Sequence, residues 1–294
     1  MSHGTVRIGI SGFRYPPWRG VFYPKGLPQR RELEYAASVF PSIEMNGTFY
    51  SLQRPEYYEE WAAQTPDNFV FSIKGSRFIT HIRRLKEVKI PLANFLASGI
   101  LKLGRKLGPI FWRFPPNFKF DPKRLESFFK LLPHDTESAA VLARRHDKRI
   151  KSRAALKPDA QRPLRHAIEI RHDSFKTPEF IELLRAHNIA LVCADTVEWP
   201  RLMDLTSDFV YCRLHGSEQL YVSGYDDKSL DAWAARVAAW AQGKQPKDAE
   251  TVTNPGSAPA RARDVYVYFD NDAKVRAPFD AQGLTARVNK ILDC

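Results

Sequence analysis

The stretch "HAIEIRHDSF", residues 166–175, begins like a buried β-strand and ends in charged side chains. Ile168 and Ile170 alternate with Glu169 and Arg171, so the two charged residues share one face of the strand. The apolar start is typical of a parallel strand that is covered on both sides. The fold therefore depends on how many such strands the chain has, and the function on where their charged ends lie.

Seven further β-branched or aromatic runs have the same character. They lie at residues 6–11, 43–47, 69–74, 109–114, 189–195, 209–215 and 264–270. Helix-like segments separate most of the runs, and Pro55, Pro122 and Pro178 each stand at a plausible first helical position. This alternation predicts an α/β fold of the (β/α)8 TIM-type barrel class. An open doubly wound sheet is the alternative, but no G-x-G-x-x-G follows the first strand.

We predict one domain over residues 1–294 with two insertions. The first, at about 133–165, holds an extra helix and a basic stretch between the fourth and fifth strands, and the second, at about 243–263, is rich in Pro, Ala and Gly. Within 144–165 there are nine Lys or Arg and two Asp, a net charge of +7 out of +12 for the whole chain. The basicity is therefore largely local, and nucleic acid is one acidic partner that it suits.

Composition sets further bounds on the class of protein. No stretch of eighteen apolar residues is present, so no membrane span is expected. Three Cys without a C-x-x-C motif favour a reduced, cytoplasmic protein. No cofactor motif, H-x-H or H-E-x-x-H occurs, which leaves a divalent metal open, and nothing sets the oligomeric state.

Nearly every predicted strand ends in polar side chains. The loops after the first three strands carry further polar side chains. In a TIM-type barrel the C-terminal strand ends build the active site. Buried ionisable groups are costly unless they are paired or bound to something, so this gathering favours a ligand site over salt bridges that only brace the barrel. The catalytic candidates are Glu44, Glu169, His215, His81 and Asp195. The substrate-binding candidates are Asn46, Tyr50, Lys74, Arg113, Arg171, His172, Arg213, Asp270, Asn271 and Trp18.

Several motifs resemble, in order and over essentially the whole chain, those of the YecE-like family, domain of unknown function 72. They are "SGFRYPPWRGVFYP" (11–24), "EMNGTFY" (44–50), "FSIKGSRFITH" (71–81), "LGPIFWRFPPNF" (107–118), "IEIRHDSF" (168–175), "VYCRLHG" (210–216) and "VYVYFDND" (265–272). The resemblance implies a TIM-barrel-like fold and supplies no established reaction. The chain departs from the family pattern at Phe13 and Phe175, where Trp is usual, at Arg113, where Gln is usual, and at Asp280, where Asn is usual.

Two functions follow from these residues. In the first, an enzyme or binder of an anionic, phosphate-bearing small molecule, the strand-end cations hold the anion and a Glu and a His move protons, with hydrolysis and isomerisation both open. In the second, the chain binds nucleic acid and cleaves phosphodiesters, through the basic insertion and the Arg- and aromatic-rich loop at 11–24. A non-catalytic scaffold whose partner uses the barrel mouth is a third interpretation.

Overall fold

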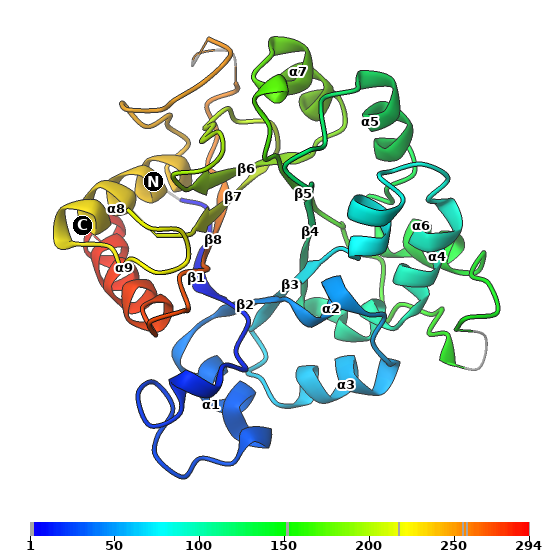
Figure 1. Cartoon of the computed structure of the whole chain (residues 1–294), viewed down its shortest axis with the longest axis horizontal. Helices are drawn as coiled ribbons and strands as arrows, with labels where there is room; N and C mark the ends of the chain where they lie inside the picture. Colours follow the sequence, from blue (N-terminus) through cyan, green and yellow to red (C-terminus); the bar gives the residue numbers. More distant parts are fainter. Residues whose placement is uncertain (1–2, 151–152, 217, 255, 257, 294) are drawn as a thin grey trace.

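The computed structural model describes residues 3–150, 153–216, 218–254, 256 and 258–293. Eight parallel strands form a closed barrel in the order β1 to β8, drawn as a ring in Figure 1. Their bounds are β1 Val6–Ser11, β2 Ser42–Met45, β3 Val70–Lys74, β4 Leu107–Arg113, β5 His166–Glu169, β6 Ala190–Asp195, β7 Phe209–Leu214 and β8 Asp264–Phe269. The predicted (β/α)8 TIM-type barrel is therefore confirmed.

Helices surround the ring of strands (Figure 1). Their bounds are α1 Glu32–Val39, α2 Gly47–Tyr50, α3 Pro55–Ala63, α4 Lys89–Ala97, α5 Pro122–Phe129, α6 Thr136–Ala143, α7 Pro178–Ala186, α8 Asp227–Ala241 and α9 Ala277–Leu292. The side chains of Asp121 and Thr177 accept backbone N–H groups at the starts of α5 and α7, which fixes where these two helices begin. Residues 196–208, between β6 and β7, contain no helix.

Helix α4, like the four-residue α2, is not predicted by the sequence pattern. It lies between β3 and β4 and buries six consecutive residues, Leu92 to Ala97. A helix that is buried nearly all round shows no alternation between an apolar and a polar face. The 3.6-residue period, on which a sequence-based prediction of a helix depends, is therefore absent there.

The first insertion packs against helix α4. It holds α6, which begins after Asp135, and the backbone N–H of Ala155 donates to the carbonyl of Ala97 at 2.9 Å. Residues 151–152 of this insertion and 255 and 257 of the second lie outside the described residues, as do the ends of the predicted domain at 1–2 and 294.

Alternate strand residues face the barrel interior and the helices. Ile168 and Ile170 pack in the cluster between strands and helices, whereas Ala167 packs in the cluster inside the barrel. Glu169 and Arg171 share the parity of Ala167, and their side chains are directed inward, as their contacts below show. The apolar and aromatic part of the interior consists of Val70, Phe111, Ala167, Ala190, Val192, Ala194, Phe209, Tyr211, Tyr266 and Tyr268.

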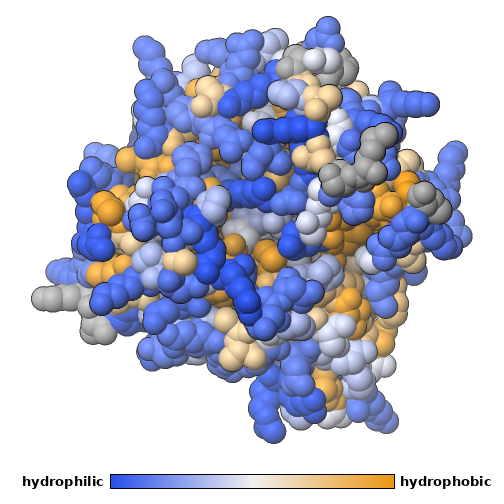
Figure 2. All heavy atoms as spheres, turned by 180° about the vertical axis from the view of Figure 1, so that it is seen from behind, coloured by the Kyte–Doolittle hydropathy of each residue, from blue (hydrophilic) through white to orange (hydrophobic). Residues whose placement is uncertain are grey.

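Figure 2 shows how hydrophilic and hydrophobic side chains are distributed over one face of the molecule. The face shown in Figure 2 is mostly hydrophilic, with hydrophobic side chains in patches between charged ones. None of the helices in the described ranges combines the length and the apolar composition needed to cross a membrane. The prediction of a cytoplasmic location is not tested by these features.

Candidate functional site

One arginine binds three carboxylates inside the barrel. Arg213, on β7, is fully buried, and its Nε and Nη2 donate to the two carboxylate oxygens of Glu44, each at 3.0 Å. Its Nη1 donates to Glu169 Oε2 at 2.7 Å, and its Nη2 also donates to Asp270 Oδ2 at 2.8 Å. Although burial favours the neutral form, the three carboxylates raise the pKa of Arg213 well above its usual value. The N–H groups of Arg213 therefore donate to side chains of the protein itself.

Glu44 is held from every side in this network. Besides the two bonds from Arg213, it accepts hydrogen bonds from Ser11 Oγ and from Tyr211 OH, both at 2.6 Å. The residue is fully buried. Because all four of these donors come from the protein itself, the geometry gives Glu44 a role in holding the barrel interior.

His215 lies between the other two carboxylates. Its Nε2 is 3.5 Å from Glu169 Oε2 and 3.3 Å from Arg213 Nη1. Its Nδ1 is 3.1 Å from Asp270 Oδ2, although the angle is not that of a hydrogen bond. Burial opposes ionisation of both acids, but Arg213 and the other cations beside them hold the pKa of Glu169 and of Asp270 well below the usual range. The structure thus brings together five predicted site residues, Glu44, Glu169, Arg213, His215 and Asp270, which we call the floor network.

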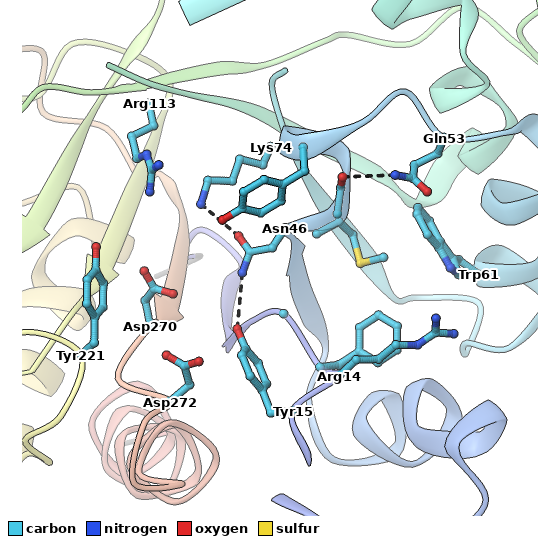
Figure 3. Close-up of a pocket in the computed structure, with 15 residues that line it drawn as sticks. Arg14, Tyr15, Asn46, Gln53, Trp61, Lys74, Arg113, Tyr221, Asp270 and Asp272 are labelled. Atoms are coloured by element: carbon cyan, nitrogen blue, oxygen red, sulfur yellow. Dashed lines mark hydrogen bonds between the residues drawn. The ribbon is translucent and has the colours of Figure 1, made fainter. Parts of the chain in front are cut away.

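A cavity of about 650 Å³ lies next to the floor network at the C-terminal ends of the strands (Figure 3). This volume is typical of small-molecule sites. Asp270 belongs both to the network and to the cavity wall. The other polar residues that line the cavity are Arg14, Tyr15, Asn46, Tyr50, Gln53, Lys74, Arg113, Tyr221 and Asp272.

Lys74, the last residue of β3, extends into this cavity (Figure 3). Its Nζ donates to Asn46 Oδ1 at 3.0 Å and lies 5.2 Å from the centroid of the Phe49 ring. It forms no salt bridge with any residue in the described ranges. Burial, together with repulsion from Arg213, lowers the pKa of Lys74 from 10.5 to about 8.

Arg113, the last residue of β4, is a second cation at the cavity. Its guanidinium carbon lies 4.6 Å from the centroid of the Phe49 ring. Its Nε is buried without a hydrogen-bond partner among the described residues, none of which forms a salt bridge with it. Burial, followed by repulsion from Arg171, lowers the pKa of Arg113. A buried donor left without an acceptor costs about 1–3 kcal/mol, so an external acceptor here is strongly favoured.

Asp272 supplies a carboxyl group on another wall of the cavity, beside Asp270 (Figure 3). Burial, together with repulsion from Asp270, raises the pKa of Asp272 from 3.8 to about 6. A carboxyl group with this pKa exchanges protons readily near neutral pH. Asp272 is absent from the predicted site residues, although its position two residues after Asp270 is a signal that the two carboxyl groups lie close together.

Arg171 and His172 line a second, more open hollow of about 590 Å³. The Arg171 Nε donates to Glu169 Oε1 at 2.7 Å, and its guanidinium carbon lies 3.8 Å from the centroid of the Trp199 ring. His172 Nδ1 lies 3.0 Å from Ser174 Oγ and caps the short turn that follows. Arg171 therefore connects the floor network to this hollow and is already paired with an acid.

Asp195 lines the same hollow and lies apart from the floor network. It accepts hydrogen bonds from Arg201 Nη1 at 3.0 Å and from Trp233 Nε1 at 3.1 Å. Along β6 it shares the parity of Leu191 and Cys193, which pack against the helices. Asp195 lies at the C-terminal end of β6, as predicted, and its side chain contacts the outer layer; its predicted catalytic role stays a prediction.

Of two further predicted residues, Tyr50 lines the cavity and His81 is not among the lining residues. Tyr50 is 68% exposed. His81, on the short η3 turn Phe78–Ile82, is half-buried, and its ring meets the Phe49 ring edge-on at 5.1 Å. Burial, with repulsion from Arg113, lowers the pKa of His81 to about 4, so its imidazole is neutral at pH 7.

Trp18 and Asn271 are buried next to residues that line the cavity. Trp18 is fully buried, stacks on Tyr15 at 4.6 Å between ring centroids, and donates from Nε1 to the Asp272 carbonyl at 3.3 Å. Asn271 is also fully buried, and its Nδ2 donates to Asp280 Oδ2 at 2.7 Å. Neither side chain is among those that line the cavity, so the predicted substrate-binding role of these two residues stays a prediction.

Metal binding has little support in the floor network. Within residues 3–150, 153–216, 218–254, 256 and 258–293, no group of three or more His, Cys, Asp or Glu side chains is arranged to hold a metal ion. The three carboxylates of the network each accept a hydrogen bond from Arg213, whose charge disfavours a second cation there.

Comparison with known proteins places the chain among uncharacterised relatives. The family model described as "Protein of unknown function DUF72" matches residues 7–292. The chain is 27% identical over 124 residues to the UPF0759 protein YunF of Bacillus subtilis and 28% identical over 127 residues to the UPF0759 protein YecE of Escherichia coli K12. These matches cover 38% and 43% of this chain and 41% and 43% of those proteins, less than half of either length.

Solved structures with the same fold cover the whole chain. A DUF72 family protein from Thermotoga maritima has a TM-score of 0.71 and 24% sequence identity, and the match covers 99% of this chain and 100% of that one. A DUF72 family protein from Enterococcus faecalis V583 has a TM-score of 0.65 and 18% identity, with both chains covered completely. Identities this low show the fold alone. Together with the family model, they confirm the resemblance seen in the sequence motifs.

The floor network predicts a large effect of removing its arginine. Arg213→Met leaves three buried carboxylates without their shared cation, so we expect the free energy of unfolding at pH 7 to fall by about 3–5 kcal/mol. Urea denaturation followed by circular dichroism measures this change. Arg31→Met, which removes an exposed pair with Glu34, should leave the midpoint unchanged. Equal midpoints for the two variants would show that the network does not stabilise the barrel.

Asp272 predicts an unusual dependence of stability on pH. Because its pKa is raised in the folded state, the folded protein binds more protons than the unfolded chain between about pH 4 and pH 6. Asp272 therefore destabilises the fold as pH rises through this window. We expect Asp272→Asn to raise the free energy of unfolding by about 2 kcal/mol at pH 7.5 and by much less at pH 4.5. In Asp67→Asn, which changes an exposed carboxylate, the effect should not grow with pH in this way, and a pH-independent effect of Asp272→Asn would contradict the assignment.

Proposed function

We propose that this chain, which belongs to the DUF72 family of proteins of unknown function, is an enzyme that acts on an anionic, phosphate-bearing small molecule in the cavity at the C-terminal end of the barrel. One observation carries the proposal. The Arg113 guanidinium faces the cavity, and its buried Nε has no partner among the described residues. A planar guanidinium is suited to bidentate binding of phosphate or carboxylate oxygens.

The balance of charge supports an anionic ligand over a cationic one. Arg213 and Arg171, which are also candidates for holding the anion, already bind the carboxylates of the floor network. Lys74, Arg113 and Arg14 line the cavity without a salt bridge to any described residue, as does the single carboxylate of Asp272, so the unpaired charge at the cavity is positive on balance. A ligand that brings negative charge satisfies Arg113 and lowers the repulsion among these cations.

Proton transfer in the cavity is assigned to Asp272 in place of the glutamates. The carboxylates of Glu44 and Glu169 are occupied by hydrogen bonds from within the protein. Arg171 and Arg213 also hold the pKa of Glu169 well below its usual range, although burial opposes this. Asp272 has a raised pKa and lines the cavity itself. An acid or base with a pKa near the working pH is the efficient kind.

The experiment for this proposal uses sugar monophosphates and the same sugars without phosphate. We expect the sugar monophosphates to raise the melting temperature of the protein and the free sugars to have no effect. Arg113→Gln should weaken phosphate-ester binding at least about tenfold in calorimetric titration, because a hydrogen bond to a charged group contributes about 1.5–3 kcal/mol. Arg31→Gln, with the same loss of charge at an exposed site, should bind like the unchanged protein. Binding that is unaffected by Arg113→Gln would overturn the proposal.

Nucleic-acid binding through the basic insertion has weaker support. Arg149, Arg162 and Arg165 each form a salt bridge with an aspartate, which reduces the charge available to a polyanion. The remaining support is the overall basicity of the segment, with Lys148 and Arg153 among its cations.

Retention on immobilised single-stranded DNA separates the two functions. Because binding to phosphate backbones weakens steeply with salt, we expect little retention at about 0.2 M salt. The triple variant with Lys148, Arg149 and Arg153 replaced by Gln should elute at the same salt concentration as the unchanged protein. Strong retention that the triple substitution abolishes would favour nucleic-acid binding instead.

A further inference from the structure

We propose that Lys74 is a nucleophile that forms an imine with the carbonyl group of the substrate, so that the substrate class is phosphorylated aldehydes or ketones. This inference deepens the function proposed above, on which it rests for the phosphate. Imine-forming lysines in enzymes are activated by burial in an apolar pocket or by a neighbouring cation. Lys74 has both features.

The surroundings of Lys74 bury its amine, and burial and repulsion from Arg213 outweigh the attraction of Glu44 and Asp270. The side chain is 5% exposed, and Nζ lies 5.2 Å from the Phe49 ring centroid and 5.6 Å from that of Phe111. No carboxylate in the described part of the chain forms a salt bridge with it. At pH 7, a lysine of pKa about 8 carries a few hundred times more free amine than one of pKa 10.5. The amine also lines the cavity, so a carbonyl compound can reach it.

Asn46 is the positioning residue for this amine. Its Nδ2 donates to Ser11 Oγ at 3.2 Å, which directs its Oδ1 toward Lys74 Nζ at 3.0 Å. An amide oxygen accepts a hydrogen bond from either the ammonium or the neutral amine. A carboxylate in the same place would instead favour the ammonium and remove the nucleophile.

The reaction balances with the groups that line the cavity. The lone pair of the neutral Lys74 amine attacks the carbonyl carbon, a C–N bond forms as the second C–O bond opens, and one proton passes from the nitrogen to the oxygen to give a hydroxyl group. An acid then protonates that hydroxyl, the remaining C–O bond breaks, and water leaves as the nitrogen lone pair forms the C=N bond. The second nitrogen proton returns to the conjugate base of the acid, so one water is released and no proton is consumed overall. Asp272 lines the same cavity (Figure 3) and is the acid for this step, because its raised pKa keeps part of it protonated near pH 6. No oxidant or reductant is needed.

Pyridoxal 5′-phosphate is a suitable probe because it carries an aldehyde and a phosphate on one small molecule. The full-length protein is incubated with the probe, the imine is reduced with sodium borohydride, and the modified lysine is located by peptide mass spectrometry. We expect Lys74 to be modified faster at pH 7 than exposed lysines such as Lys130, by tenfold or more. Lys74→Arg, which keeps a cation and cannot form an imine, should lose this modification and keep its circular dichroism spectrum. Modification of Lys74 no faster than that of Lys130 would overturn the inference.

The pH profile tests the part played by Asn46. The rate of modification of Lys74 should reach half its maximum near pH 8. Asn46→Asp should move this midpoint upward by about 1 unit or more, because the new carboxylate favours the ammonium. Asn117→Asp, which adds the same charge beside Arg84 and outside the cavity lining, should leave the midpoint in place. An unchanged midpoint in Asn46→Asp would show that Asn46 does not set the reactivity of Lys74.

A second probe separates this inference from the function on which it rests. Pyridoxal has the same aldehyde and lacks the phosphate. If both probes modify Lys74 equally fast and Arg113→Gln slows neither, Lys74 is a nucleophile and the phosphate site is wrong. If phosphate esters bind through Arg113 and neither probe modifies Lys74, the phosphate site stands and the nucleophile is wrong. Faster modification by the phosphorylated probe, lost in Arg113→Gln, supports both.

Discussion

The cavity depends on the bonds between Arg213 and three carboxylates. Glu44 lies next to the end of β2, Glu169 ends β5 and Asp270 follows β8, so Arg213 on β7 connects widely separated parts of the ring. Forming a buried network of this kind adds little net stability, because the ions must be taken out of water, whereas an incomplete network is strongly unfavourable. The floor network therefore constrains the geometry of the barrel more than it adds to its stability. The strand ends that supply the cavity residues cannot move apart without leaving a buried charge unpaired.

The floor network leaves Arg113 and Lys74, the two cations beside it, without a salt bridge to an acid in the described part of the chain. The acids of the network are held by Arg213 and Arg171, so they are poor partners for Arg113 and Lys74. Keeping a cation buried without an acid lowers the stability of the empty protein, and a ligand that supplies the missing negative charge recovers it. Binding of an anion therefore offsets the stability that is lost by burying these cations, which is a feature of binding sites.

The sequence predicts the barrel well because each strand is a separate local signal, and it predicts the chemistry of the strand ends only in part. In the sequence, Arg113 and Arg213 look the same, because each is an arginine near the end of an apolar run. They differ because Arg213 meets acids from distant strands, which only the closed ring brings together. The direction of the Asp195 side chain is not predictable for another reason: β6 is apolar on both faces, so no alternation shows which way its last residue points. Asp272, by contrast, carries a usable signal in its spacing from Asp270.

The same burial makes two strand-end cations behave in opposite ways, and this difference limits the substrate. Three carboxylates keep Arg213 permanently charged, whereas burial and repulsion from Arg213 leave Lys74, which donates to the neutral amide of Asn46, easily deprotonated. A phosphate bound directly against the Lys74 Nζ would act like a carboxylate and restore the ammonium, so phosphate and nucleophile must stay apart. Arg113 provides the separate position. A substrate that satisfies both residues must therefore carry its carbonyl group some distance from its phosphate, which excludes acyl phosphates and favours a short chain or ring between the two groups.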